Sequence, residues 1–561
     1  MWQPHLSSFR LALAIALLCL SLTARFLRKL HIQRAKVRGL PGPPHSYIWG
    51  SLRSMNEVIK TQPKRAAPQT FPGLVGEHFT LGRYFYLDVW PAGDPIMVIL
   101  DTDMMHDITV KNSLPKHPAV DDFLQHFGGP GNLVSSEGAL WKKWRSVFNP
   151  GFSATHLMSL VPIIVDECDI FCTILTKYAE KKSVFRMERA TTKLTVDVIG
   201  KVVLDIDLDS QRSENELVEA FMKQVQWMAL GVQFRPIEFV DWPIRYVIQR
   251  YLTWKMDRYI GKRIDDRFAT RAGRGKSKAI IDLALEAYLK EVKGTSGDLS
   301  AVKGIDPEFR QAAINNMKTF VFAGHDTTSS TICYVYYYLS KNPDMLTRIC
   351  QELDNVFGPD PSTVGDQLRQ DSRLLNKLEY TLAVTREVLR MQPPASTIRV
   401  GQPGFFIHDP ETGEALPTEG YMIWPVDVGL HRSAKYWSDP HVFRPERHLH
   451  GGKGDADDSA NFTSNNAWVA FSKGTRNCIG QELAIIETKV ILAMTLRQFD
   501  FHAAFDELDK LKGDKSGYPS DSTGIQEQFG DEAYQIQLGT AKPREGMPCR
   551  VSLRSPKACD W

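Results

Sequence analysis

The sequence predicts a mainly α-helical fold with small β-sheets, preceded by an N-terminal transmembrane helix. Helical patterns dominate from about residue 110 to residue 392, and strand-like segments are short and lie on either side of them. An almost unbroken apolar run covers residues 6–27. The chain has 561 residues, of which 43% are apolar, and no Gly/Ser-rich or Pro-rich linker divides it evenly. We therefore expect one large domain behind the N-terminal helix.

The apolar run of residues 6–27 is long enough to cross a bilayer, which takes roughly twenty residues. Arg10 lies near its start, where its side chain can reach the membrane interface. Six cations and no acid lie at the end of the run and after it: Arg25, Arg28, Lys29, Arg34, Lys36 and Arg38. The positive-inside rule then predicts a lumenal N-terminus and a cytosolic body. The alternative is a signal peptide cut near residues 21–24, but the basic cluster lies on the wrong side for export.

These features predict three parts: a transmembrane anchor at residues 1–30, a basic and proline-rich hinge at 31–50, and a large domain at 51–561. The hinge holds the segment Gly-Leu-Pro-Gly-Pro-Pro at residues 39–44, which is expected to be stiff. The net charge of +3 gives no strong field that would indicate nucleic acid. Eight scattered cysteines without a regular spacing indicate a reducing compartment.

The strand pattern of the large domain begins with residues 84–90 and 96–100, which a Pro-Ala-Gly-Asp-Pro turn separates. Short strands are expected again near residues 397–400 and 421–425, and between 533 and 553. Loops or insertions are expected at residues 271–278, 451–464 and 513–522.

Residues 471–480 contain one cysteine, Cys478, directly before an apolar helical pattern. The N–H groups and dipole of a helix start favour a thiolate. Gly474 suits a turn with positive φ, and Gly480 suits the close approach of a flat group. Arg476 offers a fork for a carboxylate. Together with Phe471, these residues indicate a haem whose iron takes sulfur as its axial ligand.

Two other interpretations of Cys478 are weaker. A buried structural cysteine would not need the surrounding pattern F-x-x-G-x-R-x-C-x-G. A zinc site would need further ligands, and no second cysteine or histidine stands at metal-ligand spacing.

Residues 308–342 form a long apolar helical pattern that is interrupted by Ala-Gly-His-Asp-Thr-Thr at residues 323–328. Such a violation of local preference is typical of a functional site. Threonine hydroxyls can bond back to helix carbonyls and leave a groove for a small molecule such as O2. Asp326 and Thr327 form an acid–alcohol pair that can pass protons. The alternative is a polar loop between two helices, but the continuity on both sides favours one kinked helix.

Two further pairs lie at helical spacing. Glu387 and Arg390 share a helix face with apolar turns on both sides, which indicates burial, and Arg447 is placed to join them. We expect this triad to be structural. Trp141 and Arg145 share another helix face and could hold a haem propionate, whereas Lys142 and Lys143 would face an acidic partner. Taken alone, this second motif would be an amphipathic surface helix.

In this order the motifs resemble those of the cytochrome P-450 family, from about residue 40 to the C-terminus. The resemblance implies the P-450 fold, haem b, and residues 51–561 as a haem-thiolate monooxygenase domain. It implies Cys478 as the axial iron ligand and Asp326 with Thr327 as the route of protons for O–O scission. Glu387, Arg390 and Arg447 become the structural triad. The residues expected around the haem are Trp141, Arg145, Arg399, Phe471, Arg476, Cys478 and Gly480.

The resemblance also implies partners and a location. Electrons would come from NADPH through a membrane-bound flavoprotein reductase, with cytochrome b5 as a further partner. The protein would be a single-pass protein of the endoplasmic reticulum membrane with its catalytic domain in the cytosol. Its composition is similar to that of fungal members of secondary metabolism. Two departures are visible: His448 stands where members often carry phenylalanine, which we expect to be a minor packing change, and residues 506–535 look inserted.

The function that we expect is insertion of one oxygen atom of O2 into a lipophilic small molecule, by hydroxylation or epoxidation. Its pocket is expected at residues 123–127, 227–234, 320–322 and 395–398. One alternative is a reductase-independent isomerase or dehydratase, but such relatives often lose the acid–alcohol pair, which is intact here. Another is a haem sensor without catalysis. A secreted cysteine hydrolase would need a histidine that activates Cys478, and the basic flank of the anchor argues against export.

Overall fold

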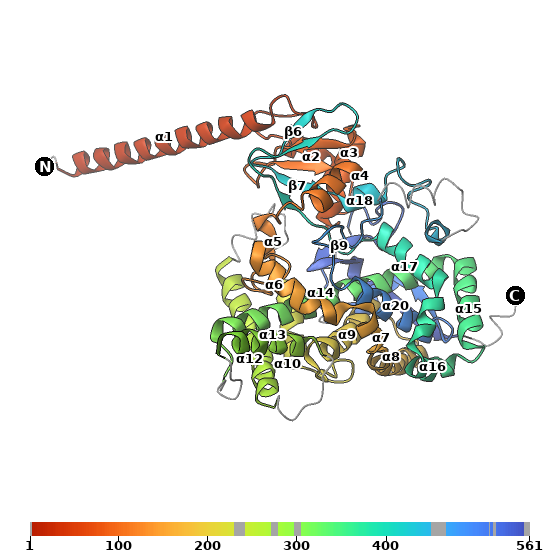
Figure 1. Cartoon of the computed structure of the whole chain (residues 1–561). Coiled ribbons are helices and arrows are strands. Elements are labelled where there is room, and N and C mark those ends of the chain that lie inside the picture. The colour runs from red at the N-terminus through yellow and green to blue at the C-terminus, as the bar shows by residue number, and fades with distance from the viewer. Residues whose placement is uncertain are drawn as a thin grey trace.

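The computed structural model describes residues 3–228, 242–270, 279–296, 304–449, 467–514, 516–519 and 523–554. A long helix, α1 (Gln3–Val37), projects from the body, and the strands nearest to it form one end of the molecule, above a larger helical part (Figure 1). The predicted fold class is confirmed. The expected loops at 271–278 and 451–464, and part of that at 513–522, lie outside the described residues.

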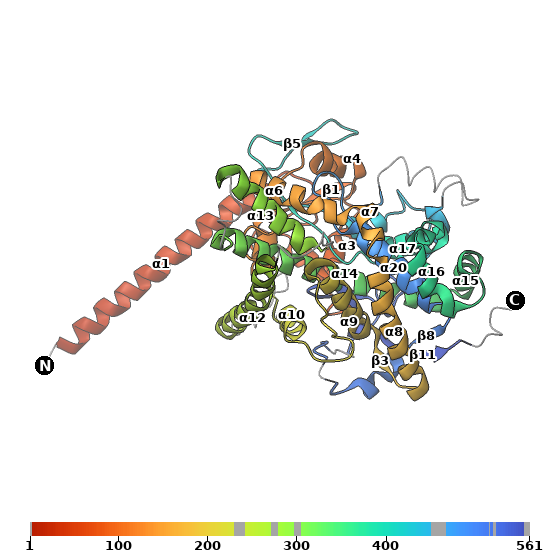
Figure 2. The same cartoon turned by 60° about the horizontal axis from the view of Figure 1, so that its bottom comes forward.

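The helical part is built around α14 (Pro307–Lys341), which is buried along most of its length and passes through the centre of the body (Figure 2). It packs against α9, α12, α17 and α20. The other helices, with the labels of Figure 1, are α2 (Leu52–Ile59), α3 (Phe71–His78), α4 (Thr102–His106), α5 (Pro118–Leu124), α6 (Gly138–Phe148), α7 (Ala154–Met158), α8 (Val161–Lys181), α9 (Met187–Ile199), α10 (Glu216–Trp227), α12 (Trp242–Ala269), α13 (Ile280–Ser296), α15 (Pro343–Phe357), α16 (Val364–Gln370), α17 (Glu379–Met391), α18 (Asp427–His431) and α20 (Gln481–Thr495).

The strands form small sheets. The largest has the order β1-β2-β7-β4, with β2 and β7 parallel in the register Ile96↔Met422 and the other pairs antiparallel. A second sheet has the order β3-β11-β8, and two hairpins pair β5 with β6 and β9 with β10. The bounds are β1 (Tyr84–Leu87), β2 (Ile96–Ile99), β3 (Phe185–Arg186), β4 (Arg399–Val400), β5 (Phe406–His408), β6 (Ala415–Pro417), β7 (Met422–Pro425), β8 (Phe499–Ala503), β9 (Gln535–Leu538), β10 (Thr540–Pro543) and β11 (Pro548–Leu553).

The predicted elements are found, most of them one to three residues shorter than the patterns indicated. The segment at 308–342 is one uninterrupted helix, so the alternative of a polar loop is wrong. The hydroxyl of Thr327 bonds back to the carbonyl of Ala323 at 2.8 Å, as the sequence predicted.

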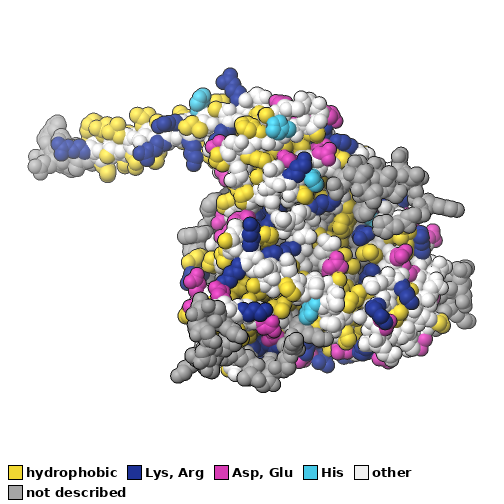
Figure 3. Space-filling model, viewed as in Figure 1, with side chains coloured by type: hydrophobic (Ala, Val, Ile, Leu, Met, Phe, Trp, Pro, Cys, Tyr) yellow, Lys and Arg dark blue, Asp and Glu magenta, His cyan; other side chains and the backbone are white. Residues whose placement is uncertain are grey.

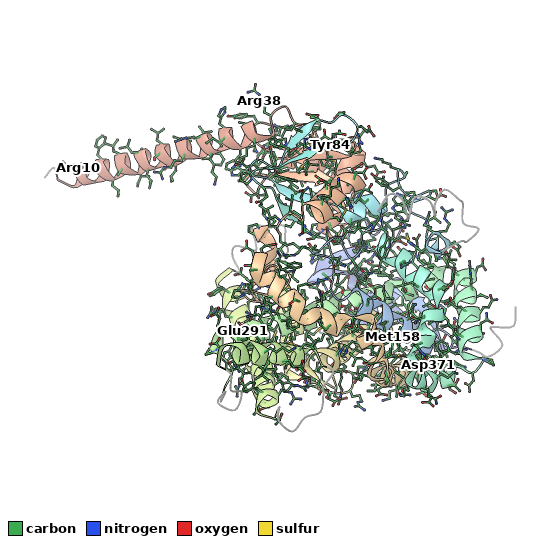
Figure 4. All side chains as sticks on the ribbon, viewed as in Figure 1. Arg10, Arg38, Tyr84, Met158, Glu291 and Asp371 are labelled. Carbon is green, nitrogen blue, oxygen red and sulfur yellow. The ribbon has the colours of Figure 1, made fainter. Side chains whose placement is uncertain are left out.

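The helix α1 continues to Val37, beyond the expected end of the anchor at residue 30. Its stretch Phe9–Val37 is long and apolar enough to cross a membrane, and its outer part is covered with apolar side chains (Figure 3). Arg10 lies near the far end and Arg38 lies where the helix meets the body (Figure 4). At that end Arg34 is buried, and its Nη1 lies 2.6 Å from Oδ1 of Asp88. The base of the helix is therefore fastened to the body.

Candidate functional site

A cavity of about 1450 Å³ lies between α14, the loop before α20 and the sheet of β1, β2, β7 and β4. Ala323, Gly324 and Thr327 of α14 form one wall of the cavity. Cys478 and its neighbours form another wall. The cavity therefore brings together the two strongest motifs of the sequence, which are about 150 residues apart.

The loop that carries Cys478 is closed by its own backbone. The N–H of Cys478 donates to the carbonyl of Phe471 at 2.9 Å, and the N–H of Asn477 donates to Gly474 at 3.2 Å. Gly474 has a φ of +76°, and a Cβ there would lie 2.1 Å from the carbonyl oxygen of Thr109. Only glycine meets both demands. Gly480 lies at the cavity and caps α20.

The thiol of Cys478 is exposed to the cavity, and the surrounding protein shields it from bulk solvent. Burial raises the pKa of the thiol, and the backbone N–H groups of Gly480 and Gln481 together with Arg145 act in the opposite direction. The helix start thus favours the thiolate, as expected, but its effect on the pKa is smaller than that of burial. A bound metal ion would reverse the balance, because coordination deprotonates a thiol.

Cationic side chains converge beside this thiol. The guanidinium of Arg476 is 2.7 Å from Glu137, and it stacks on Trp141, with its central carbon 4.6 Å from the ring centroid. Arg399 is fully buried, and its Nε and Nη2 have no hydrogen-bond partner within the described parts of the chain. Burial, followed by Arg476, lowers the pKa of Arg399 to about 10. The cluster is therefore short of negative charge and suits an anionic ligand.

Lys116 belongs to the same cluster and was missed by the sequence analysis. Its Nζ bonds to the hydroxyl of Thr397, and its backbone pairs with that of Arg399. Burial lowers the pKa of this lysine, and Arg399 and Arg476 lower it further. The residue lies in a Pro-Lys-His-Pro segment that carries no recognisable motif, and only the β-bridge to Arg399 brings it to the site.

Arg145 differs from its expected role. Its Nη1 donates to the carbonyl of Asn477 at 2.9 Å and its Nη2 to the Asn477 side chain at 2.8 Å. The fork that was expected to hold a propionate therefore fixes the cysteine loop, although Arg145 and Trp141 both line the cavity.

The acid–alcohol pair is split between the two sides of α14. Thr327 lines the cavity, whereas Asp326 is fully buried and points away from it. Oδ2 of Asp326 accepts from the N–H of Thr540 at 2.8 Å, and Oδ1 lies 2.6 Å from Nζ of Lys542. Burial opposes ionisation of Asp326, but Lys542 and His325 outweigh it, so the pKa of this carboxyl is lowered. In this state Asp326 is an anion outside the cavity.

The triad of Glu387, Arg390 and Arg447 is formed as expected. Arg390 donates to both carboxylate oxygens of Glu387 at 2.8 Å, and Nε of Arg447 donates at 3.2 Å. The backbone N–H of Arg444 adds a bond at 2.9 Å. Burial opposes ionisation, but Arg390 and His448 outweigh it and hold the pKa of Glu387 well below its usual range.

His448 has a larger role than the minor packing change that the sequence predicted. Its Nε2 lies 2.9 Å from Oε2 of Glu387, so it is a fourth side chain of this cluster. A phenylalanine at this position could not make that bond.

More than half of the expected pocket residues that the structure describes are found at the cavity, but Trp227 and Met228 are not among them. Those that line it are Phe123, Leu124, Phe320, Phe322, Ala395, Ser396, Thr397 and Ile398. Phe127 instead is buried, with its ring stacked on that of Phe322 at 4.4 Å. Of the expected range 227–234, residues 229–234 lie outside the described residues.

These features fit an iron porphyrin. The cavity is mostly apolar, one wall offers a thiol, and Arg399 beside that thiol has two N–H groups left for a carboxylate such as a porphyrin carries. The fold and site thus define the class of haem proteins with a cysteine thiolate ligand.

Comparison with known proteins supports this class. A model of the family Cytochrome P450 matches residues 80–523. The chain is 36% identical over 555 residues to Cytochrome P450 monooxygenase polC of Polytolypa hystricis, covering 98% of this chain and 96% of the relative. It is 35% identical over 506 residues to Cytochrome P450 monooxygenase acrF of Aspergillus aculeatus, covering 88% and 99%. The chain belongs to the cytochrome P450 family, whose members bind haem b, and it is a monooxygenase of that family.

Proposed function

We propose that this protein inserts one oxygen atom of O2 into a lipophilic small molecule of secondary metabolism, by hydroxylation or epoxidation. The apolar lining of the cavity supports this substrate class, and the similarity to fungal monooxygenases supports the reaction. Haem, when bound, would supply the activation of O2. The intact pair of Asp326 and Thr327 favours an oxygenase over a reductase-independent isomerase or dehydratase.

The side chains around the cavity would have distinct roles. Cys478 would be the axial ligand of the iron, since its thiol alone of the described cysteines faces the cavity. Lys116, Arg399 and Arg476 would bind the propionates, with Trp141 packed against Arg476 and Arg145 holding the loop. Phe471 and Gly480 would shape the loop around the sulfur. Thr327 would hold a proton at the cavity and Asp326 would replenish it.

We further propose an NADPH-dependent flavoprotein reductase as electron donor, with cytochrome b5 as a second partner. The exposed side chain of Lys142 on α6 supports an acidic partner, because it lies one turn from the Arg145 side chain that fixes the cysteine loop. Lys143 is also exposed, but its Nζ is paired with Glu291 of the same chain at 2.8 Å. The anchor at residues 1–30, the hinge at 31–50 and the catalytic domain at 51–561 would place the protein in the endoplasmic reticulum membrane with its catalytic domain in the cytosol.

The decisive experiment replaces the proposed ligand. The reduced carbon-monoxide complex of the wild-type protein is expected to show the far red-shifted Soret band of a thiolate-ligated haem, and Cys478→Ala is expected to abolish it. Cys172→Ala, at a cysteine away from the cavity, serves as the control and is expected to keep the band. An unchanged band in Cys478→Ala would remove the ligand assignment and, with it, the proposed reaction.

A further inference from the structure

The roles proposed for the residues around Cys478 leave one polar corner of the cavity unexplained. Asp427 at the start of α18, Ser396 in the segment before β4, and Trp424 on β7 all line the cavity. The indole Nε1 of Trp424 donates to Oγ of Ser396 at 3.0 Å. The Ser396 hydroxyl in turn interacts with the carboxyl of Asp427 and lowers its pKa. The three side chains therefore form one chain of polar groups on the cavity wall.

The sheet brings these three residues together. The strand β4 pairs with β7, which places the segment before β4 beside Trp424. The strand β7 ends at Pro425, and α18 begins shortly after it with Asp427. The N–H of Val428 donates to Oδ1 of Asp427 at 3.2 Å. The carboxyl is thus held by its own backbone and by one neighbouring side chain.

Asp427 is buried without a cation. Its exposed fraction is 6%, and the part of the chain that the structure describes gives it no salt bridge. Burial raises its pKa to about 7, because no positive charge close by offsets the loss of water around the carboxylate. The buried acids Asp326 and Glu387, by contrast, each meet a cation, and their pKa values are lowered. No group among the described residues therefore compensates the charge of Asp427.

The groups next to this corner are apolar. Met422 and Pro425 of β7 line the cavity on either side of Trp424, and Pro72 lines it from α3, which packs against α18. Charges in apolar surroundings are poorly screened, so an ion pair formed here is stronger than one at the surface. The indole ring of Trp424 would add to the attraction, because aromatic rings attract cations. The corner therefore suits a positive group on an apolar skeleton.

The other acids that the structure places at the cavity differ from Asp427. Asp94 and Asp122 are exposed, and Asp94 also has a partner in His117 at 3.7 Å. Glu487 is buried on α20, but burial alone raises its pKa well above the usual value, so it is neutral. Asp427 thus combines burial, access to the cavity and hydrogen bonds that support its anion.

We propose that Asp427, together with Ser396 and Trp424, is a substrate-anchoring subsite of the cavity, and that the substrate is a lipophilic molecule with a basic nitrogen. The protonated amine would pair with the carboxylate of Asp427. The Ser396 hydroxyl, itself held by Trp424, would keep that carboxylate in place. The proposal rests on the proposed oxygenation of a lipophilic small molecule and narrows the class of that substrate.

Binding of two probes of equal shape tests the proposal. One is N,N-dimethyloctylamine, and the other is the branched alkane in which a CH group replaces its nitrogen. Each is titrated into the full-length haem-loaded protein, with equilibrium dialysis for the affinity and the low- to high-spin shift of the haem for entry into the cavity. Asp427→Asn is expected to weaken binding of the amine by about 10- to 100-fold and that of the alkane by less than about twofold, because only the amine loses an ion-pair partner. Ser396→Ala is expected to weaken the amine alone by about two- to tenfold.

Asp94→Asn is the matched control, because it removes one negative charge from the cavity lining at an exposed position. Its effect on the affinity for the amine is expected to be less than about twofold. If Asp427→Asn does not fold, Ser396→Ala still tests the subsite through its selective effect on the amine.

Three results would overturn the proposal. One is an unchanged affinity for the amine, or equal losses for both probes, in Asp427→Asn. Another is a red-shifted Soret band on addition of the amine, which would place its nitrogen on the iron. The third is an equal loss for octanol, which would show a site for neutral hydrogen-bond donors instead of cations.

The binding measurements need no turnover, so the subsite and the proposed function can fail separately. An active oxygenase whose affinity for the amine does not depend on Asp427 would contradict the subsite alone. A protein that binds the amine as expected but oxygenates no lipophilic substrate would contradict the proposed function and leave the subsite intact.

Discussion

Glu387 and Asp326 are both fully buried carboxylates that meet cations, yet their surroundings differ. Glu387 receives bonds from Arg390, Arg447, His448 and the backbone of Arg444. Asp326 receives one backbone bond and shares a single lysine with Glu188. The charge of Glu387 is compensated by several donors, whereas that of Asp326 depends on a single cation that a second acid also contacts. Loss of either acid should therefore have different consequences for the fold.

Replacing each acid by its amide tests this difference most directly. Glu387→Gln leaves two buried guanidinium groups uncompensated, so the free energy of unfolding is expected to fall by about 3–5 kcal/mol, with loss of bound haem. Asp326→Asn leaves Lys542 paired with Glu188, so the loss is expected to be smaller, about 1–3 kcal/mol. Urea unfolding of the haem-loaded proteins measures both.

Lys223→Ala serves as the control for these two variants, because its pair with Glu219 is exposed and is expected to contribute less than about 1 kcal/mol. Equal losses in Glu387→Gln and Asp326→Asn would contradict the distinction between the two clusters.

The buried pair of Arg34 and Asp88 extends the comparison to the anchor. A chain that begins at residue 30 keeps Arg34, whereas one that begins at residue 39 leaves Asp88 with His45, at 3.0 Å, as its remaining ion-pair partner. Both chains are expected to bind haem and to partition less to membranes. The shorter one is expected to be less stable by about 1–3 kcal/mol in urea unfolding. Tight membrane association of either chain would instead indicate a second anchor.

Asp427 is a buried acid for which the described residues provide no salt bridge. Burial raises its pKa to about 7, against about 3.9 in an unfolded chain. The unfolded state therefore loses its proton first, and this carboxyl contributes stability below about pH 4 that is lost as pH rises to 7. Asp427→Asn removes the pH dependence that this carboxyl contributes. The stability of the variant relative to the wild type is therefore expected to increase between about pH 4 and pH 7. Thermal unfolding at a series of pH values measures the difference, and a constant difference would show that Asp427 is already ionised.

The parts of the site that the sequence predicted depend on local spacing. Glu387 and Arg390 lie three residues apart on one helix, and the glycines around Cys478 shape a single loop, so their geometry follows from short-range rules. Lys116, Glu188 and Lys542 could not be predicted in this way. Each is a single charged residue in an ordinary element, and only the packing of β10 and α9 on α14, or the β-bridge to Arg399, gives it a partner.

Even a correct motif did not predict the direction of a side chain. Arg145 was placed on the correct helix face, but its fork is taken by Asn477, which the spacing of Trp141 and Arg145 does not reveal. Likewise, the sequence predicted that Asp326 and Thr327 act together because they are neighbours in the chain. Neighbouring residues on a helix, however, point about 100° apart around its axis. The split of this pair between cavity and interior follows from that geometry.

The close fit between α1 and the body has a mechanical consequence. Leu30, Arg34 and Val37 are buried at the junction, and the hydroxyl of Tyr421 donates to the carbonyl of Lys36 at 2.5 Å. Tyr421 is itself part of the cavity lining. A helix held in a bilayer by its apolar length would therefore not act as a loose tether. It would set the tilt of the catalytic domain relative to the membrane. That tilt in turn would determine how deep in the bilayer a lipophilic molecule enters the protein.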